Sequence, residues 1–257
     1  PQSGNVLLRR RQYRLADEEK KAIVMAQCFI SAKILNGRTV LQRGKRDHPN
    51  RVGNSIERTI ALMGNAAKKV FSVNNLESVR GIEGDAAQIY FAELDQLILD
   101  QKDDFFMHGR SRRPPRDRFN ALLSMFYTLL VHECRAALES VGLDPAVGFL
   151  HRDRPGRPSL ALDLMEELRP YIADRMALSL INRKQLSKDD FTVLENGAVY
   201  LNNDSRKNVL AIWQKRKQVK ITHPYLEEKI PLGLLPYVQA LLLARYLRGD
   251  LDGYPAF

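Results

Sequence analysis

A chain of 257 residues with 44% hydrophobic and 27% charged residues has an ordinary globular composition, sufficient for one large domain or two small ones. Its 40 lysines and arginines outnumber 30 acids, and the net charge of +10 favours a polyanionic partner, most commonly nucleic acid. Two cysteines argue against a disulfide framework or zinc cluster, and no stretch reaches the roughly 18 apolar residues of a membrane span. We therefore expect a cytoplasmic protein with no membrane contact.

The first residues show no signal-peptide pattern, and the missing initiator methionine suggests a piece of a longer protein. We interpret residues 1–16 as a linker remnant and residues 17–257 as one α-helical domain. Apolar residues at helical spacing predict a long helix from Asp17 to about Arg46 and a second from about Gly53 to Val70.

The predicted third helix, from Leu76 to about Lys102, carries one polar residue, Glu83, on an otherwise apolar or aromatic stripe. A carboxylate facing the core is costly unless a partner neutralises it. Glu83 lies between Gly81 and Gly84, which are poor helix formers but permit close approach of another backbone or a ligand. Two interpretations stay open: a functional acid, or an acid held by a buried arginine such as Arg80.

A basic segment follows at residues 103–116, stiffened by two adjacent prolines. Such a cluster would neutralise several phosphates, although a solvated basic loop has the same composition. The arginines of this region are Arg110, Arg112, Arg113, Arg116 and Arg118.

Asp117 is the expected N-cap of a helix that continues to about Val141. Asn120 and Tyr127 fall on its inward stripe, where polar groups need partners. Both fit a supporting role beside a functional site and equally fit satisfied core residues.

Residues 148–170 combine a loop that contains His151 and three arginines with a short helix that has Ser159 as its expected N-cap. At about 100° per residue, Asp163 and Glu166 project within roughly 60° of each other, opposite the apolar stripe of that helix.

The remaining chain predicts helix to about Asn182, a β-hairpin over 191–201 with an Asn196-Gly197 turn, and helices over 204–220 and 235–249. The predicted fold class is therefore mainly α, a multi-helix domain with one small β-hairpin.

Glu83, His151 and Asp163, with Glu166 beside them, form a candidate metal site. Carboxylates and one imidazole suit Mg²⁺ or Mn²⁺, whereas zinc ordinarily takes more nitrogen or sulfur ligands. A site of this kind supports in-line attack on phosphorus. The three residues lie 68 and 12 positions apart, so only the fold can bring them together.

Three ordered motifs resemble the CRISPR adaptation integrase, the first of the CRISPR-associated proteins. Residues 76–87 read Leu-Glu-Ser-Val-Arg-Gly-Ile-Glu-Gly-Asp-Ala-Ala, and residues 113–124 read Arg-Pro-Pro-Arg-Asp-Arg-Phe-Asn-Ala-Leu-Leu-Ser with Tyr127 after them. The third motif, residues 147–170, begins Val-Gly-Phe-Leu-His-Arg-Asp-Arg. Together with the hairpin and the closing segment, the motifs look most similar to the subtype I-C branch.

The resemblance implies a metal-dependent DNA endonuclease and integrase with Mg²⁺ or Mn²⁺ held by Glu83, His151 and Asp163, and with Glu166 at a further acidic position. In this family, the 3′-hydroxyl of a DNA fragment attacks a phosphodiester at the CRISPR repeat boundary. The implied partners are double-stranded and branched DNA and a small second CRISPR-associated protein.

The family also has an N-terminal β-sheet domain of about 80 residues, ordinary in size for a domain. We expect that domain to be absent here, with the homodimer weakened or lost as a consequence.

Clustering alone makes Arg112, Arg113, Arg152 and Arg157 candidates for phosphate contacts. Two other functions are open: a non-catalytic basic helical scaffold for nucleic acid, and a metal phosphohydrolase of small phosphate esters. The scaffold would bind DNA indifferently to chelator, and the phosphohydrolase would turn over without DNA.

Overall fold

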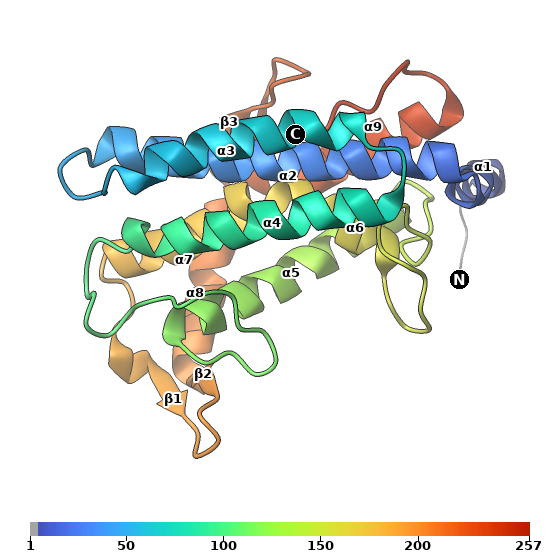
Figure 1. Cartoon of the computed structure of the whole chain (residues 1–257). Helices are drawn as coiled ribbons and strands as arrows, with labels where there is room; N and C mark the ends of the chain where they lie inside the picture. Colours follow the sequence, from blue (N-terminus) through green and yellow to red (C-terminus); the bar gives the residue numbers. More distant parts are fainter. Residues whose placement is uncertain (1–4) are drawn as a thin grey trace.

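The computed structural model describes residues 5–257, and helices make up most of that part of the chain (Figure 1). The predicted mainly α class is confirmed. The helices are α1 (Val6–Asp17), α2 (Glu19–Asp47), α3 (Ser55–Lys69), α4 (Leu76–Leu94), α5 (Arg118–Ser140), α6 (Ser159–Leu168), α7 (Arg175–Asn182), α8 (Asn203–Lys217) and α9 (Leu235–Arg248). The strands are β1 (Phe191–Val193), β2 (Val199–Leu201), β3 (Lys220–Thr222) and β4 (Lys229–Pro231).

Helix α1 occupies most of the segment that we expected to be a linker remnant. Asn5 caps it by accepting hydrogen bonds from two backbone amides of its first turn. Its buried Gln12 donates to the carbonyl oxygens of Asp144 and Val147, each at 2.8 Å, which ties α1 to the chain that precedes α6. Residues 6–16 of that segment are therefore helical and held against the rest of the fold, while residues 1–4 lie outside the described part.

Helix α2 forms the centre of the fold and contacts α3, α4 and α6. In Figure 1, α2, α3 and α4 run side by side along the length of the molecule. Residues Phe29 and Ile30 of α2 are fully buried, and burial of such side chains contributes about 1.5–3 kcal/mol each. The long α2 is thus a rigid support for groups on its other faces.

Helix α4 ends earlier than its sequence pattern predicts. The chain turns at Asp95, whose carboxylate accepts a hydrogen bond of 2.7 Å from the Met107 amide and one of 2.6 Å from Lys102 Nζ. These bonds draw residues 102–107 back beside the helix end, so the helix cannot continue to Lys102.

Helix α5 is capped by Asp117, which accepts a hydrogen bond from the Asn120 amide at 2.6 Å, as predicted. It is long and apolar enough to cross a membrane by length and composition alone, the one such helix within residues 5–257. Its buried Phe126, Leu130 and Leu138 pack inside the protein against neighbours that include α6 and α9. The apolar character of α5 is therefore used in the core.

Helix α6 is buried on nearly all sides, and Leu162 alone among residues 159–168 is partly exposed. Asp163 and Glu166, which were predicted to lie opposite the apolar stripe of this helix, are also buried, at 0% and 3% exposed. Ser159 is the first helical residue, and its predecessor Pro158 occupies the cap position. A wider π-type stretch over Arg169–Asp174 then joins α6 to α7.

The predicted hairpin is present as β1 and β2, paired from Phe191 with Leu201 to Val193 with Val199. A second hairpin, β3 with β4, follows α8, so the prediction of a single hairpin is wrong. Strands of three residues are too short to show an alternating pattern. The predicted helix was also continued through the basic residues 215–217 to Lys220, which is the first residue of β3.

Candidate metal centre

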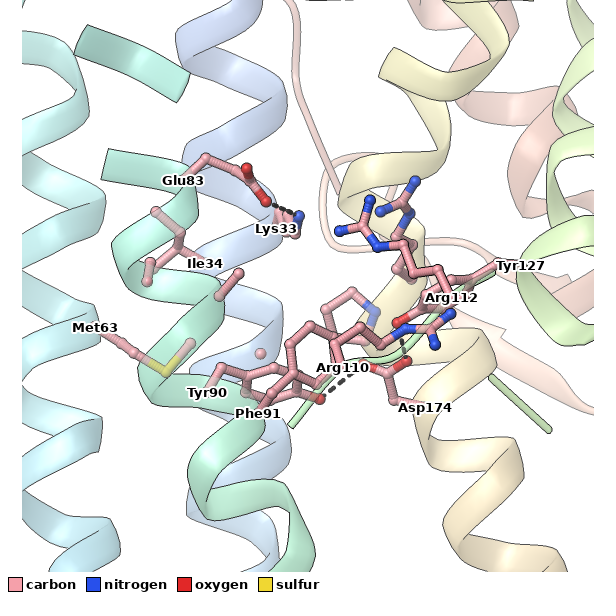
Figure 2. Close-up of a pocket in the computed structure, with 15 residues that line it drawn as sticks. Lys33, Ile34, Met63, Glu83, Tyr90, Phe91, Arg110, Arg112, Tyr127 and Asp174 are labelled. Atoms are coloured by element: carbon pink, nitrogen blue, oxygen red, sulfur yellow. Dashed lines mark hydrogen bonds and ion pairs between the residues drawn. The ribbon is translucent and has the colours of Figure 1, made fainter. Parts of the chain in front are cut away.

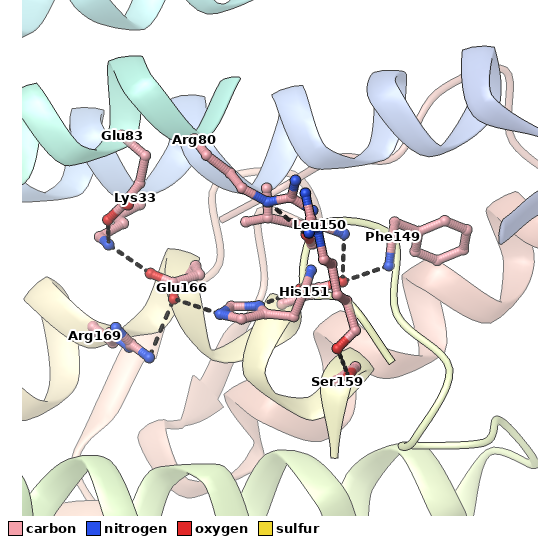
Figure 3. Close-up of polar contacts among 11 residues, drawn as sticks. Lys33, Arg80, Glu83, Phe149, Leu150, His151, Ser159, Glu166 and Arg169 are labelled. Carbon is pink, nitrogen blue, oxygen red and sulfur yellow. Dashed lines mark hydrogen bonds and ion pairs between the residues drawn. The ribbon is translucent and has the colours of Figure 1, made fainter. Parts of the chain in front are cut away.

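Two acids from different helices meet at one lysine. Glu83 of α4 forms an ion pair with Lys33 of α2 (Figure 2), and Lys33 Nζ lies 2.7 Å from Glu166 Oε2 on α6 (Figure 3). The Lys33 side chain is 14% exposed, and those of Glu83 and Glu166 are 27% and 4% exposed. A cation therefore lies between the two carboxylates in a partly dry position, where unscreened attraction is strong.

The open question about Glu83 is answered by this pair. Arg80 does not neutralise Glu83, because its guanidinium donates to the Leu150 carbonyl and to Glu77. Glu83 is half-buried at the edge of a hollow rather than turned into the core. A Cβ added at Gly81 or Gly84 would meet no heavy atom within 4 Å, so neither glycine makes room for another part of the described chain.

His151 is fixed by the buried carboxylate of Asp163. Asp163 Oδ1 lies 2.6 Å from His151 Nδ1 and accepts the His151 amide at 3.0 Å. Its Oδ2 accepts the amides of Phe149 and Leu150 at 2.6 and 3.0 Å. A Cβ on Gly148 would lie 2.7 Å from Oδ2, so only glycine lets this loop fold over the carboxylate.

This arrangement sets which imidazole nitrogen is available. A proton on Nδ1 donates to Asp163, which leaves Nε2 of a neutral ring with its lone pair. Nε2 faces Glu166 Oε1 at 3.9 Å (Figure 3). Both oxygens of Asp163 are taken by the His151 loop, whereas His151 Nε2 and Glu166 face a common space.

Two cations hold Glu166 in its charged form. Burial raises the pKa of this carboxyl, but Arg169 at 3.1 Å and Lys33 outweigh burial and bring the pKa well below its usual range. Its Oε2 accepts no well-directed hydrogen bond despite the nearby lysine. An ionised, buried carboxylate with an unsatisfied oxygen is suited to a cation.

The donor set fits Mg²⁺ or Mn²⁺. Glu83 and Glu166 offer carboxylate oxygens, and His151 offers one imidazole nitrogen, a combination typical of hard divalent cations. Within residues 5–257, no three His, Cys, Asp or Glu side chains are arranged as a ready metal-binding group. In this structure the ammonium of Lys33 stands between the two acids.

A basic hollow of about 440 Å³ opens onto these groups. Arg80, Arg152, Arg154 and Arg157 line it with Glu77 as a further acid at its rim. Arg152 forms an ion pair with Glu77, while the side chains of Arg154 and Arg157 have no ion-pair partner in the described part of the chain. The predicted Arg152 and Arg157 therefore lie beside His151.

The other predicted arginines differ from each other. Arg112 lines a second pocket beside Glu83, whereas Arg113 is exposed and lines neither pocket. Asn120 is fully buried and supports the segment of Arg110 and Ser111 that precedes α5. Its carbonyl oxygen accepts hydrogen bonds from Arg110 Nη1 at 2.7 Å and from the Ser111 amide at 3.1 Å. Asn120 thus positions Arg110.

Tyr127 is a supporting residue of that second pocket. Its hydroxyl donates to Asp174 at 2.7 Å, and Tyr90 donates to the same carboxylate at 2.8 Å. The guanidiniums of Arg110 and Arg169 lie 5.2 and 4.9 Å from the Tyr127 ring centroid. Burial raises the pKa of Asp174 to about 6 although both hydroxyls oppose the rise.

Three residues of this region were not predicted as part of the site: Lys33, Arg169 and Asp174. Lys33 lies on a long amphipathic helix, where a lysine ordinarily marks the solvent face. Arg169 is three residues after Glu166, a spacing that places two helical residues on one face and could have indicated an ion pair.

Two acids and a histidine on a helical scaffold, bordered by arginines, are suited to metal-assisted chemistry on phosphodiesters. Residues 1–215 match the family described as CRISPR associated protein Cas1. The chain belongs to this Cas1 family and is an endonuclease and integrase of CRISPR spacer acquisition.

Curated relatives support this membership over the whole chain. A Cas1 endonuclease of Rhodospirillum rubrum is 56% identical, with 99% of this chain and 75% of the relative aligned. One of Chlorobaculum tepidum is 50% identical over 100% of this chain and 75% of its own length. A third, from Leptospira interrogans, is 44% identical and aligns over 98% of this chain and 99% of itself.

Solved structures have the same fold. A casposase bound to integration product superimposes with a TM-score of 0.86 at 26% identity, covering 100% of this chain and 70% of that protein. A Cas6-RT-Cas1–Cas2 complex gives 0.82 at 26% identity, covering 98% of this chain and 27% of that one.

Proposed function

We propose that this chain joins the 3′-hydroxyl of a protospacer fragment to a phosphodiester at the CRISPR repeat boundary, with Mg²⁺ or Mn²⁺ held by Glu83, His151 Nε2 and Glu166. The observation that carries the proposal is the position of Lys33, a cation between two acids from separate helices beside a free imidazole nitrogen. The bound metal would stabilise negative charge on the attacking and leaving oxygens.

This proposal changes one residue role implied by the resemblance. Asp163, expected among the catalytic metal ligands, already accepts four hydrogen bonds from the His151 loop. We assign it to orientation of the imidazole, and we keep Glu166, which the resemblance placed at a further acidic position, as the second carboxylate ligand. Partners of ligating histidines act in this way, by fixing the tautomer and the ring orientation.

The arginines divide between two tasks in this proposal. Arg152, Arg154 and Arg157 border the hollow and would hold the phosphates that flank the reacting one. Arg112 would contact a phosphate from the other side of Glu83, and Arg113 would contact DNA farther out. Lys33 must leave the space between the acids when a metal enters, and it then remains close enough to neutralise a phosphate.

Double-stranded and branched DNA and a small second CRISPR-associated protein are the partners that we propose. The similarity to a casposase bound to integration product supports the first, and the similarity to a Cas1–Cas2 complex supports the second. Subtype I-C, a cytoplasmic location, the domain division at residue 16 and assembly as a homodimer are further proposals.

The test is strand transfer and nicking on a branched DNA with a repeat-like junction, in Mn²⁺ and in chelator. Wild type is compared with Glu83→Gln and with Asp85→Asn, an exposed carboxylate-to-amide change on the same helix. We expect metal-dependent products from wild type and Asp85→Asn and none from Glu83→Gln. Salt-sensitive DNA binding with activity indifferent to both chelator and Glu83→Gln would instead favour the non-catalytic scaffold.

A further inference from the structure

A second group of basic side chains lies away from the metal centre, around a cavity of about 290 Å³. Arg43 from the end of α2, Arg175 from α7, Arg183 just after α7 and Arg216 from α8 line it. His48 follows α2 at the same rim. We call this cavity the arginine hollow, defined by these five residues. None of them lines either pocket at Glu83.

The charge of the arginine hollow is poorly balanced. Asp47 is the carboxylate in its lining, and it is shared between Arg43 at 3.2 Å and Arg46 at 3.0 Å. Within residues 5–257, the side chains of Arg183 and Arg216 have no ion-pair or hydrogen-bond partner. Four guanidiniums thus face one cavity with a single, already paired, carboxylate.

Arg175 shows that this crowding has an energetic cost. Burial lowers the pKa of its guanidinium first, and the charges of Arg43 and Arg216 lower it further. The ring of Tyr171, 4.8 Å below the guanidinium, compensates in part. An anion that enters the cavity would offset the repulsion that the Arg175 guanidinium experiences from Arg43 and Arg216.

The shape of the hollow fits a phosphate group. Its lining combines apolar side chains, which include the buried Val40, Leu97 and Leu178, with the four guanidiniums. Guanidiniums bind phosphate through paired N–H donors, and the four arginines here come from α2, α7, the residue just after α7, and α8. The volume is near the lower limit of ordinary ligand cavities, so one phosphate with its attached sugar can enter.

The hollow is far enough from the metal centre to act separately. Ten residues of α2 separate Lys33 from Arg43, which corresponds to about 15 Å along the helix axis. At 3.4 Å per base pair, that distance is roughly four to five base pairs of duplex.

We propose that the arginine hollow is a second phosphate-binding site, and that the backbone of DNA outside the metal centre supplies the phosphate. The site requires neither the metal nor the chemistry proposed for Glu83, so it goes beyond the proposed function. It would retain a DNA segment while the metal centre acts on another part of the same molecule.

The experiment measures binding of a labelled DNA duplex to the full chain in chelator over a series of salt concentrations. The hollow variant Arg183→Gln/Arg216→Gln is compared with Arg135→Gln/Arg206→Gln, which removes the same charge at exposed positions of α5 and α8. We expect about tenfold weaker binding by the hollow variant, and a slope of log K against log salt that is smaller by about two. The control variant should retain nearly the wild-type slope.

A second arm uses adenosine monophosphate and inorganic phosphate as free sources. Thermal stabilisation of the wild type, absent from the hollow variant, together with unchanged DNA binding would support the phosphate site and overturn DNA as its source. Equal DNA binding by both variants with no response to either free phosphate would overturn the proposal entirely. Because every measurement is made in chelator, failure of the metal-dependent activity would not change these outcomes.

Discussion

Replacement of Asp163 by asparagine separates the two roles that this residue could have. In the structure its carboxylate accepts four hydrogen bonds while fully buried. An amide keeps one accepting oxygen but turns an NH₂ group toward two N–H donors. Two charge-assisted bonds of about 1.5–3 kcal/mol each are lost, so the free energy of unfolding should fall by about 4 kcal/mol. That change corresponds to about 8–16 °C in Tm for a domain of this size.

The assay is thermal unfolding combined with Mn²⁺ titration calorimetry. As a positioning residue, Asp163 should affect metal affinity only through His151, so Asp163→Asn should weaken Mn²⁺ binding about 10–100-fold without abolishing it. Asp153→Asn is the matched control, because this exposed carboxylate of the same loop makes one long hydrogen bond of 3.5 Å. Near-wild-type stability of Asp163→Asn with no Mn²⁺ binding would refute the reasoning and make Asp163 a ligand.

Three further predictions concern the surroundings of the centre. Lys33→Gln should tighten Mn²⁺ binding about tenfold in calorimetry without DNA, because the ammonium competes with the ion for the same two carboxylates; weaker binding would contradict this. Gly84→Ala should raise the free energy of unfolding by about 1 kcal/mol, because an added Cβ meets nothing within 4 Å and alanine favours the helix. Gly148→Ala should lower the free energy of unfolding, because its Cβ would lie 2.7 Å from a buried carboxylate oxygen. The third prediction is measured by urea unfolding over a range of pH. Burial raises the pKa of Asp174 to about 6 in the folded state, against the ordinary 3.8, so the folded protein binds this proton more tightly than the unfolded chain. Its contribution to stability is therefore present below pH 4 and is lost as the pH rises through about 6, for a total decline of about 3 kcal/mol. Asp174→Asn should remove that decline, and an unchanged pH profile would contradict it.

The helical class and the candidacy of Glu83 could be predicted because both depend on local pattern. The stripes of α4 and α5 are regular, and Glu83 was conspicuous as the one acid on an apolar stripe. The capping of α5 by Asp117 also follows from sequence, since an N-cap is a contact over three residues. Such contacts between near neighbours in the chain do not depend on how the rest of the chain folds.

The relative roles of Asp163 and Glu166 could not be predicted, because they depend on loop geometry. The two acids are three residues apart on one helix face, and the sequence does not reveal which one receives the amides of residues 149–151. The role of Lys33 could not be predicted either, because its partners come from α4 and α6, about 50 and 130 residues away in the chain. Contacts at that range are decided by the packing of α2 against both helices.

The most direct test of the metal centre is a crystal of this chain soaked in Mn²⁺ and measured for anomalous scattering. We predict a single strong peak bonded to the carboxylates of Glu83 and Glu166 and to His151 Nε2, with the Lys33 ammonium displaced from its position between the acids. A peak coordinated by Asp163, or no peak among these side chains while Lys33 still joins the two acids, would contradict the account.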